Sequence, residues 1–93
     1  MIISLKSGDV VFNDKKVHLT KNEMTVLKTL NKQEITTIVE LYNMLYGVNV
    51  KELSKYDKRL IYVIISRIRK KLENGLIIHN VYDYGYRIEV VNG

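Results

Sequence analysis

The sequence predicts a single α+β domain, in which a short N-terminal antiparallel sheet is followed by three helices and a C-terminal β-hairpin. Short β-branched runs separated by turn-forming residues stand at both ends of the chain, and apolar residues recur at helical spacing between them. No proline, repeat or linker divides the sequence. With 93 residues, 46% of them hydrophobic and 27% charged, the chain has the length and balance of one small globular domain over residues 1–93.

The first 19 residues carry the pattern of a small antiparallel sheet. Two turn-forming pairs, Gly8-Asp9 and Asn13-Asp14, separate three short apolar runs. These runs are Ile2–Leu5, Val10–Phe12 and Val17–Leu19. Two-residue turns between short β-branched runs are typical of hairpins, so we expect an N-terminal sheet over residues 1–19.

The first helix has a clear N-terminal signal. Thr20 and Glu23 have the spacing of a capping box, in which the Thr20 hydroxyl accepts from the Glu23 amide and the carboxylate reaches back to Thr20. Leu19 and Met24 stand at the two positions of a hydrophobic staple. One helical face then continues through Met24, Leu27 and Leu30. These signals predict a helix at about 21–32.

The second helix is predicted to begin at Ile35-Thr36, with Thr36 as its N-cap. One apolar face at helical spacing consists of Ile38, Leu41 and Leu45. Gly47 follows Tyr46, and glycine at this position commonly ends a helix. The segment after Gly47 is polar and basic, so we expect a loop there.

The third helix is predicted at about 58–73, beginning at Asp57 or Lys58 and ending before Asn74-Gly75. Its buried stripe consists of Ile61, Ile65, Ile68 and Leu72, with Ile64 beside Ile65. A carboxylate at Asp57 near the helix start stabilises the N-terminus of the helix dipole. Residues 20–75 are therefore expected to form a three-helix core.

Residues 76–91 have the pattern of a β-hairpin. Two extended runs, Leu76–Val81 and Arg87–Val91, flank a tip rich in tyrosine and glycine. We expect Tyr86 to pack into the core, because an amphipathic ring often closes a small core. Tyr84, which stands beside Gly85, is expected to be exposed.

The positive charge of the chain is concentrated on the third helix and the segment before it. The net charge is +5, and residues 51–71 alone carry eight Lys or Arg against two Asp or Glu. A clustered excess of base is expected for a polyanionic partner, although basic helix faces are also common as solvated surfaces. A helix fits the major groove of DNA, where Arg can pair with guanine and other cations can bind phosphates. The candidate DNA-binding residues are Arg59, Tyr62, Ser66, Arg67, Arg69 and Lys70 on the helix and Asn80, Tyr82, Tyr84 and Arg87 on the hairpin.

Four motifs in order along the chain resemble the OmpR/PhoB-type effector domain. The run from Leu19 to Glu23 is similar to the start of its first helix, and Leu41 with Tyr46-Gly47 is similar to its second helix. The run Ile65–Glu73 resembles its recognition-helix signature, and Val81 with Gly85-Tyr86-Arg87 resembles its wing. The resemblance covers nearly the whole chain and implies a winged helix-turn-helix fold.

The same resemblance implies how the domain meets DNA. The third helix would enter the major groove and the hairpin, as a wing, the adjacent minor groove, with tandem binding to direct repeats through head-to-tail contacts. Carried over by position, Ser66 and Arg67 would face bases, while Arg59, Arg69 and Lys70 would hold phosphates. Asn80 and Tyr82 would lie at the edge of the wing.

The chain also departs from the family pattern. Tyr82 stands where the wing usually has Arg, and Tyr62 and Ile64 replace the Asp and His common in the recognition helix. The 47–58 loop is longer than usual, and in the family this loop can contact RNA polymerase. Met1 stands almost directly before the predicted sheet, so this sequence is expected to be an effector domain without a receiver domain, either as a standalone regulator or as a piece of a longer one.

We expect neither catalysis nor a cofactor. His18 and His79 are about 60 residues apart and have no Glu or Cys at ligand spacing, so no metal site is expected, and no glycine-rich phosphate loop is present. Without cysteine, a signal peptide or an apolar stretch of about 20 residues, the protein is expected in the cytoplasm, associated with the nucleoid and not with a membrane. The leading hypothesis is a sequence-specific transcriptional regulator that binds double-stranded DNA. The alternatives are a winged-helix interaction module for RNA polymerase or another regulator, and a plasmid or phage replication factor.

Overall fold

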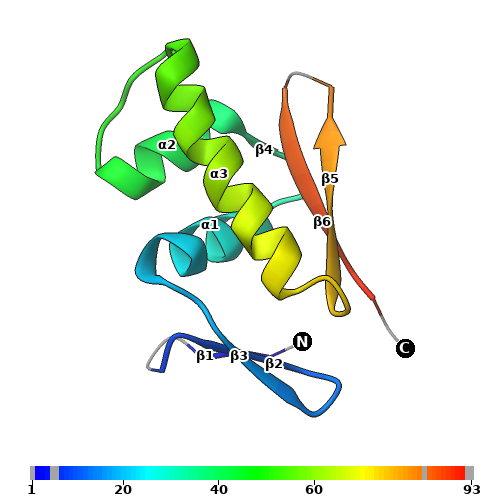
Figure 1. The fold of residues 1–93 in the computed structure, drawn as a ribbon. Coiled ribbons are helices and arrows are strands. Elements are labelled where there is room, and N and C mark those ends of the chain that lie inside the picture. Colours follow the sequence, from blue (N-terminus) through cyan, green and yellow to red (C-terminus); the bar gives the residue numbers. More distant parts are fainter. Residues whose placement is uncertain (1, 5–6, 83, 92–93) are drawn as a thin grey trace.

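A three-stranded sheet, three helices and a β-hairpin follow one another along the chain, and a short strand between the first two helices pairs with the hairpin to form a second three-stranded sheet (Figure 1). The computed structural model describes residues 2–4, 7–82 and 84–91. The strands are β1 (Ile2–Ser4), β2 (Asp9–Phe12), β3 (Lys15–His18), β4 (Thr36–Thr37), β5 (Leu76–Val81) and β6 (Gly85–Val90). The helices are α1 (Lys21–Lys32), α2 (Ile38–Tyr46) and α3 (Lys55–Lys71). The predicted order of sheet, helices and hairpin is confirmed.

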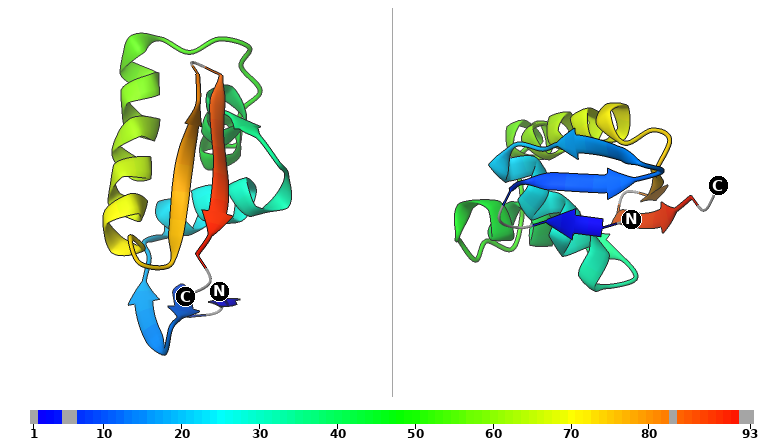
Figure 2. Two further views of the ribbon diagram at one scale, coloured as in Figure 1. Left: turned by 90° about the vertical axis from the view of Figure 1, so that its right-hand side faces the viewer. Right: turned by 90° about the horizontal axis from the view of Figure 1, so that it is seen from below.

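The N-terminal sheet has the order β1-β2-β3, with both pairs antiparallel (Figure 2). Asn13 and Asp14 form the β2–β3 turn with φ of 47° and 61°, the left-handed values that a two-residue hairpin turn requires. Val10 is fully buried beneath the helices, and Phe12 packs over Gly75. Leu5, which the predicted first run included, lies outside the described residues.

Helix α1 has the bounds and the cap that the sequence predicts. The Glu23 amide donates to the Thr20 hydroxyl at 3.2 Å, and the Thr20 amide donates to Glu23 Oε1 at 3.0 Å. Leu19 and Met24 are both buried at this end of the helix. The reciprocal cap satisfies amide donors that the first turn of a helix otherwise leaves without partners.

The predicted N-cap of the second helix is wrong by one residue. Thr37 caps α2 and forms a second capping box with Glu40, whereas Thr36 is fully buried in β4 and pairs with Tyr86 of β6. A pairing with a strand about 50 residues away therefore decides where the helix begins. The predicted end is confirmed: Gly47 has φ of 63°, and its amide donates to the Asn43 carbonyl.

Helix α3 begins earlier than predicted, at Lys55 instead of Asp57 or Lys58, and ends at Lys71 instead of Glu73. The Ser54 hydroxyl accepts from the Asp57 amide at 3.1 Å, so Ser54 is the N-cap and the loop before it is correspondingly shorter. Asp57 lies in the first turn, as expected. The predicted stripe is confirmed: Ile61, Ile64, Ile65, Ile68 and Leu72 are all buried.

The C-terminal sheet has the order β4-β6-β5, so the wing hairpin β5–β6 is joined to the helical core through β4. Strand β6 begins at Gly85, two residues before the predicted start at Arg87, because Gly85 and Tyr86 pair with Thr37 and Thr36. Figure 2 shows the hairpin running alongside α3, with its tip toward the N-terminal end of that helix. The predicted burial of Tyr86 and exposure of Tyr84 are both confirmed.

Candidate nucleic-acid interface

One side of α3 is polar, basic and open to solvent. Because the isoleucine stripe packs against α1, α2 and the wing, the side chains on the opposite arc point outward. The exposed residues on that arc are Arg59, Tyr62, Val63, Ser66, Arg67 and Lys70. Five of the six predicted helix-site residues therefore share one exposed surface, which we call the α3 face.

The cations of the α3 face have no acidic partners among the described residues. Lys71 on the neighbouring side of the helix is the one α3 cation in an ion pair there, with Glu23. The charges of Arg59, Arg67 and Lys70 are therefore uncompensated at short range. Such a surface attracts a polyanion, with a strength that salt reduces.

Arg69 is different, because its guanidinium turns toward the wing. Its Nε and Nη2 donate to the Ile78 carbonyl oxygen of β5 at 3.2 and 2.6 Å, and Nη2 also donates to Asn80 Oδ1 at 2.7 Å. The guanidinium carbon lies 5.9 Å from the centre of the Tyr86 ring. Two predicted DNA-binding residues, Arg69 and Asn80, are thus bound to each other within the protein.

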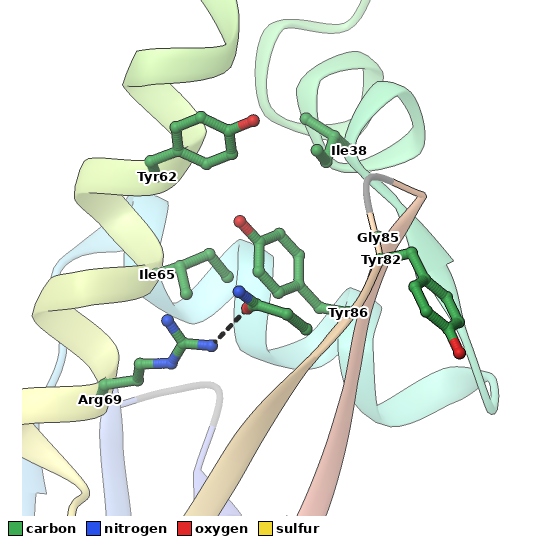
Figure 3. A pocket seen from close by; sticks show the side chains of 8 residues that line it. Ile38, Tyr62, Ile65, Arg69, Tyr82, Gly85 and Tyr86 are labelled. Carbon is green, nitrogen blue, oxygen red and sulfur yellow. Dashed lines mark hydrogen bonds between the residues drawn. The ribbon is translucent and has the colours of Figure 1, made fainter.

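A hollow of about 280 Å³ lies between the wing and the part of α3 that contains Tyr62 and Ile65 (Figure 3). Tyr62 and Ile65 of α3 line one side of it, and Tyr86 with Asn80 lines the other. Burial raises the pKa of Tyr86, as does the neighbouring Tyr62, while the Arg69 charge opposes them. The hollow separates the α3 face from the wing. Arg69, near the C-terminal end of α3, connects the two across it.

The wing tip is the most exposed aromatic surface of the domain. Tyr82 is 97% exposed with φ of 50°, and its ring points away from Arg69 and Tyr86 (Figure 3). Tyr84 is also exposed, as is Arg87 on β6. None of these three side chains is needed to fill the core, so each is available to a partner.

Two exposed cations at the start of α3 are not among the candidate residues that the sequence suggested. Lys55 and Lys58 lie in the first turns of α3 and are exposed, because the helix begins at Lys55. The spacing of Ser54 and Asp57 is a recognisable N-cap pattern and would have indicated the earlier start. The structure therefore extends the basic surface by one helical turn toward the 47–54 loop.

The family of transcriptional regulatory protein C-terminal domains matches residues 14–88 of the sequence. The chain belongs to this family. It is an OmpR/PhoB-type effector domain, as the four sequence motifs predicted. The family consists of DNA-binding transcription regulators, so the chain is one of these and not an enzyme.

Two solved DNA-binding domains share the fold of this effector domain. That of Bacillus subtilis CssR has a TM-score of 0.76 at 16% identity, with 95% of this chain and 98% of that chain covered. That of the response regulator AdeR, in complex with an intercistronic region, has a TM-score of 0.73 at 25% identity, with 97% and 94% covered. No curated protein gives a significant sequence match. The predicted winged-helix fold is thereby confirmed.

The described part of the effector domain contains neither a membrane-spanning helix nor a metal-binding cluster. Over the described residues, no helix combines the length and the apolar character needed to span a bilayer. Within the same residues, no three His, Cys, Asp or Glu side chains gather in a way that would hold a metal ion.

Proposed function

We propose that this domain recognises a specific DNA sequence by placing α3 in the major groove and the β5–β6 wing on the adjacent minor groove. The observation that carries the proposal is the α3 face, where Arg59, Arg67 and Lys70 lie exposed with no acidic neighbour paired to them among the described residues. A helix fits the major groove, and Arg is the side chain that most often reads guanine there.

Within this arrangement the exposed residues divide into two roles. Ser66 and Arg67 would face base edges, while Arg59 and Lys70 would neutralise phosphates on either side. On the wing, Tyr82, Tyr84 and Arg87 would meet the sugar-phosphate edge of the minor groove, where an aromatic ring can pack on sugars and a cation can pair with a phosphate. Support comes from the AdeR domain, whose structure was determined in complex with an intercistronic region.

Selection from a randomised duplex tests the proposal directly. Fluorescence anisotropy would be measured between about 50 and 200 mM salt, and the bound DNA would be sequenced; affinity is expected to fall by orders of magnitude over that range. Enrichment of one motif supports sequence-specific recognition. Salt-dependent binding without an enriched motif would indicate a non-specific architectural role, and no binding at low salt would contradict the proposal.

The same selection tests how many domains bind together. We propose that two copies bind head to tail on direct repeats. As a DNA-binding protein, the domain is also proposed to be associated with the nucleoid in the cytoplasm. The enriched motif should then contain two copies in one orientation, about one helical turn or 10 bp apart. A palindromic motif would instead require a two-fold symmetric dimer. Sites clustered at a replication origin instead of at promoters would favour a replication factor.

A second function is favoured by the surface at the end of α2. Between the end of α2 and the first turn of α3, several apolar side chains are exposed: Met44, Tyr46, Val48, Val50 and Tyr56. Exposed apolar surface commonly marks a protein contact. We therefore propose that residues 47–58, which form the loop after α2 and the first turn of α3, contact RNA polymerase. Val48→Ser with Val50→Ser should leave operator binding unchanged and abolish activation in a reconstituted transcription assay; unchanged activation would contradict this contact.

A further inference from the structure

The edge of the wing that faces α3 is tied to that helix at one point. Strand β5 is the outer strand of its sheet, so its outward carbonyl groups have no neighbouring strand to bind. Arg69 supplies donors there: two N–H groups bind the Ile78 carbonyl oxygen, and Nη2 also binds Asn80 Oδ1. We call this group of three residues, Arg69, Ile78 and Asn80, the wing clamp.

We propose that Arg69 is a positioning residue that holds the wing at a fixed distance and angle from α3, so that the two elements meet DNA as one rigid surface. The inference rests on the proposed docking of α3 and wing. It departs from the role that the family resemblance assigns to this position, which is a phosphate contact.

The half of β5 near the wing tip is packed less deeply than the other half. Leu76 and Ile78 of this strand are buried in the core, but Asn80 is exposed and Val81 only partly buried. The tip end of β6 is fixed by its pairing with β4, whereas β5 pairs only with β6. The tip end of β5 is therefore held through β6 on one side, and a contact on its free edge adds a direct restraint from α3 on the other side.

The geometry of the wing clamp requires arginine in particular. A guanidinium presents several N–H donors in a planar fork, and here Nε and Nη2 together bind one carbonyl oxygen while Nη2 also reaches the Asn80 amide. A lysine ammonium carries the same charge on a flexible stem and cannot reproduce this fork. Arg69→Lys therefore removes the clamp and keeps the charge.

Three variants separate positioning from phosphate binding. Positioning predicts that Arg69→Lys weakens binding to the selected operator by about tenfold or more, with the slope of log affinity against log salt unchanged. A lost phosphate contact lowers that slope by about 0.9. Lys70→Ala, on the α3 face, is the matched control and should show this lower slope. Asn80→Ala removes only the hydrogen bond to Oδ1 and keeps the two to the Ile78 carbonyl, so it should give a smaller loss, also with the slope unchanged, and the double variant should be no weaker than Arg69→Lys alone.

A measurement on the free protein completes the test. Amide hydrogen exchange in residues 76–82 should increase in Arg69→Lys and Asn80→Ala but not in Lys70→Ala, with melting temperatures well above the temperature of the binding assay in all three. Wild-type-like affinity of Arg69→Lys, or a lower salt slope in that variant, would overturn the clamp. Absence of DNA binding by the unmodified domain would instead contradict the proposed function, and the exchange data would still decide whether Arg69 orders the wing.

Discussion

The Lys71 ammonium lies 2.6 Å from Oε1 of Glu23, so the last turn of α3 is joined to the first turn of α1. The same carboxylate oxygen accepts from the Thr20 amide, and the Glu23 side chain is 2% exposed. Burial acts to raise the pKa of Glu23, but hydrogen bonds from Lys71 and Thr20 outweigh it and hold the pKa below its usual value. One charged pair thus fixes the C-terminal end of α3 to the domain core.

Removing the cation of this pair should cost more stability than removing the carboxylate charge. Lys71→Met leaves a buried carboxylate without its ion partner, and we expect a loss of about 3 kcal/mol in the free energy of unfolding. Glu23→Gln keeps an oxygen for the Thr20 amide and leaves an ammonium that is 37% exposed and can reach water, so about 1–2 kcal/mol is expected. Urea denaturation followed by circular dichroism measures both. Equal losses of unfolding free energy in the two variants would show that the unpaired buried carboxylate is not the main cause of the destabilisation.

Acid should destabilise the domain through two carboxylates. The pKa of Asp9 is lowered chiefly by its hydrogen bond with His18, and that of Glu23 by Lys71 and Thr20 despite burial. Because folding favours the charged forms, their contribution is complete above the usual values of 3.8 and 4.5 and is lost as the pH falls through the lower folded values. The urea midpoint should therefore fall between pH 6 and about pH 3. The difference between wild type and Lys71→Met should shrink over that range, and a constant difference would contradict this role for Glu23.

Two glycines should differ in their tolerance of alanine for reasons that their φ angles alone do not reveal. At Gly85 an added Cβ would overlap the Thr36 carbonyl oxygen and lie 2.8 Å from its carbon, so the backbones of β4 and β6 would have to separate. We expect Gly85→Ala to cost at least about 3 kcal/mol of unfolding free energy. Gly47 has φ of 63° but nothing within 4 Å, so Gly47→Ala should cost only about 1 kcal/mol. Thermal melts of the two variants test the order, which the reverse ranking would contradict.

Features set by neighbouring residues were predictable from the sequence, and features set by distant pairing were not. The α1 cap lies within four residues and was predicted correctly, as was the isoleucine stripe of α3. The predicted N-cap of α2 was wrong because Thr36 pairs with Tyr86 in the structure. A two-residue strand has no recognisable pattern in the local sequence. Periodicity placed Arg69 near the polar surface of α3, but only the position of β5 shows that its guanidinium turns to the wing.

The α3 face should contain one residue that reads sequence and one that binds any DNA. Arg67→Ala is expected to lose about 1–3 kcal/mol of discrimination at one base pair of the operator, because a bidentate contact to guanine is lost there. Lys70→Ala should weaken binding to all sequences by a similar factor and lower the salt slope by about 0.9. Competition of single-base operator variants against a scrambled duplex measures both quantities.

The comparison between these two variants is informative because both residues are exposed, charged and on the same face of one helix. Loss of positive charge alone would affect them equally, so a difference in base preference must come from where each side chain points in the groove. If Arg67→Ala weakened operator and scrambled duplex by the same factor, Arg67 would be a phosphate ligand. The reading of bases would then have to come from Ser66 or Tyr62, and the helix would lie in the groove rotated toward the wing.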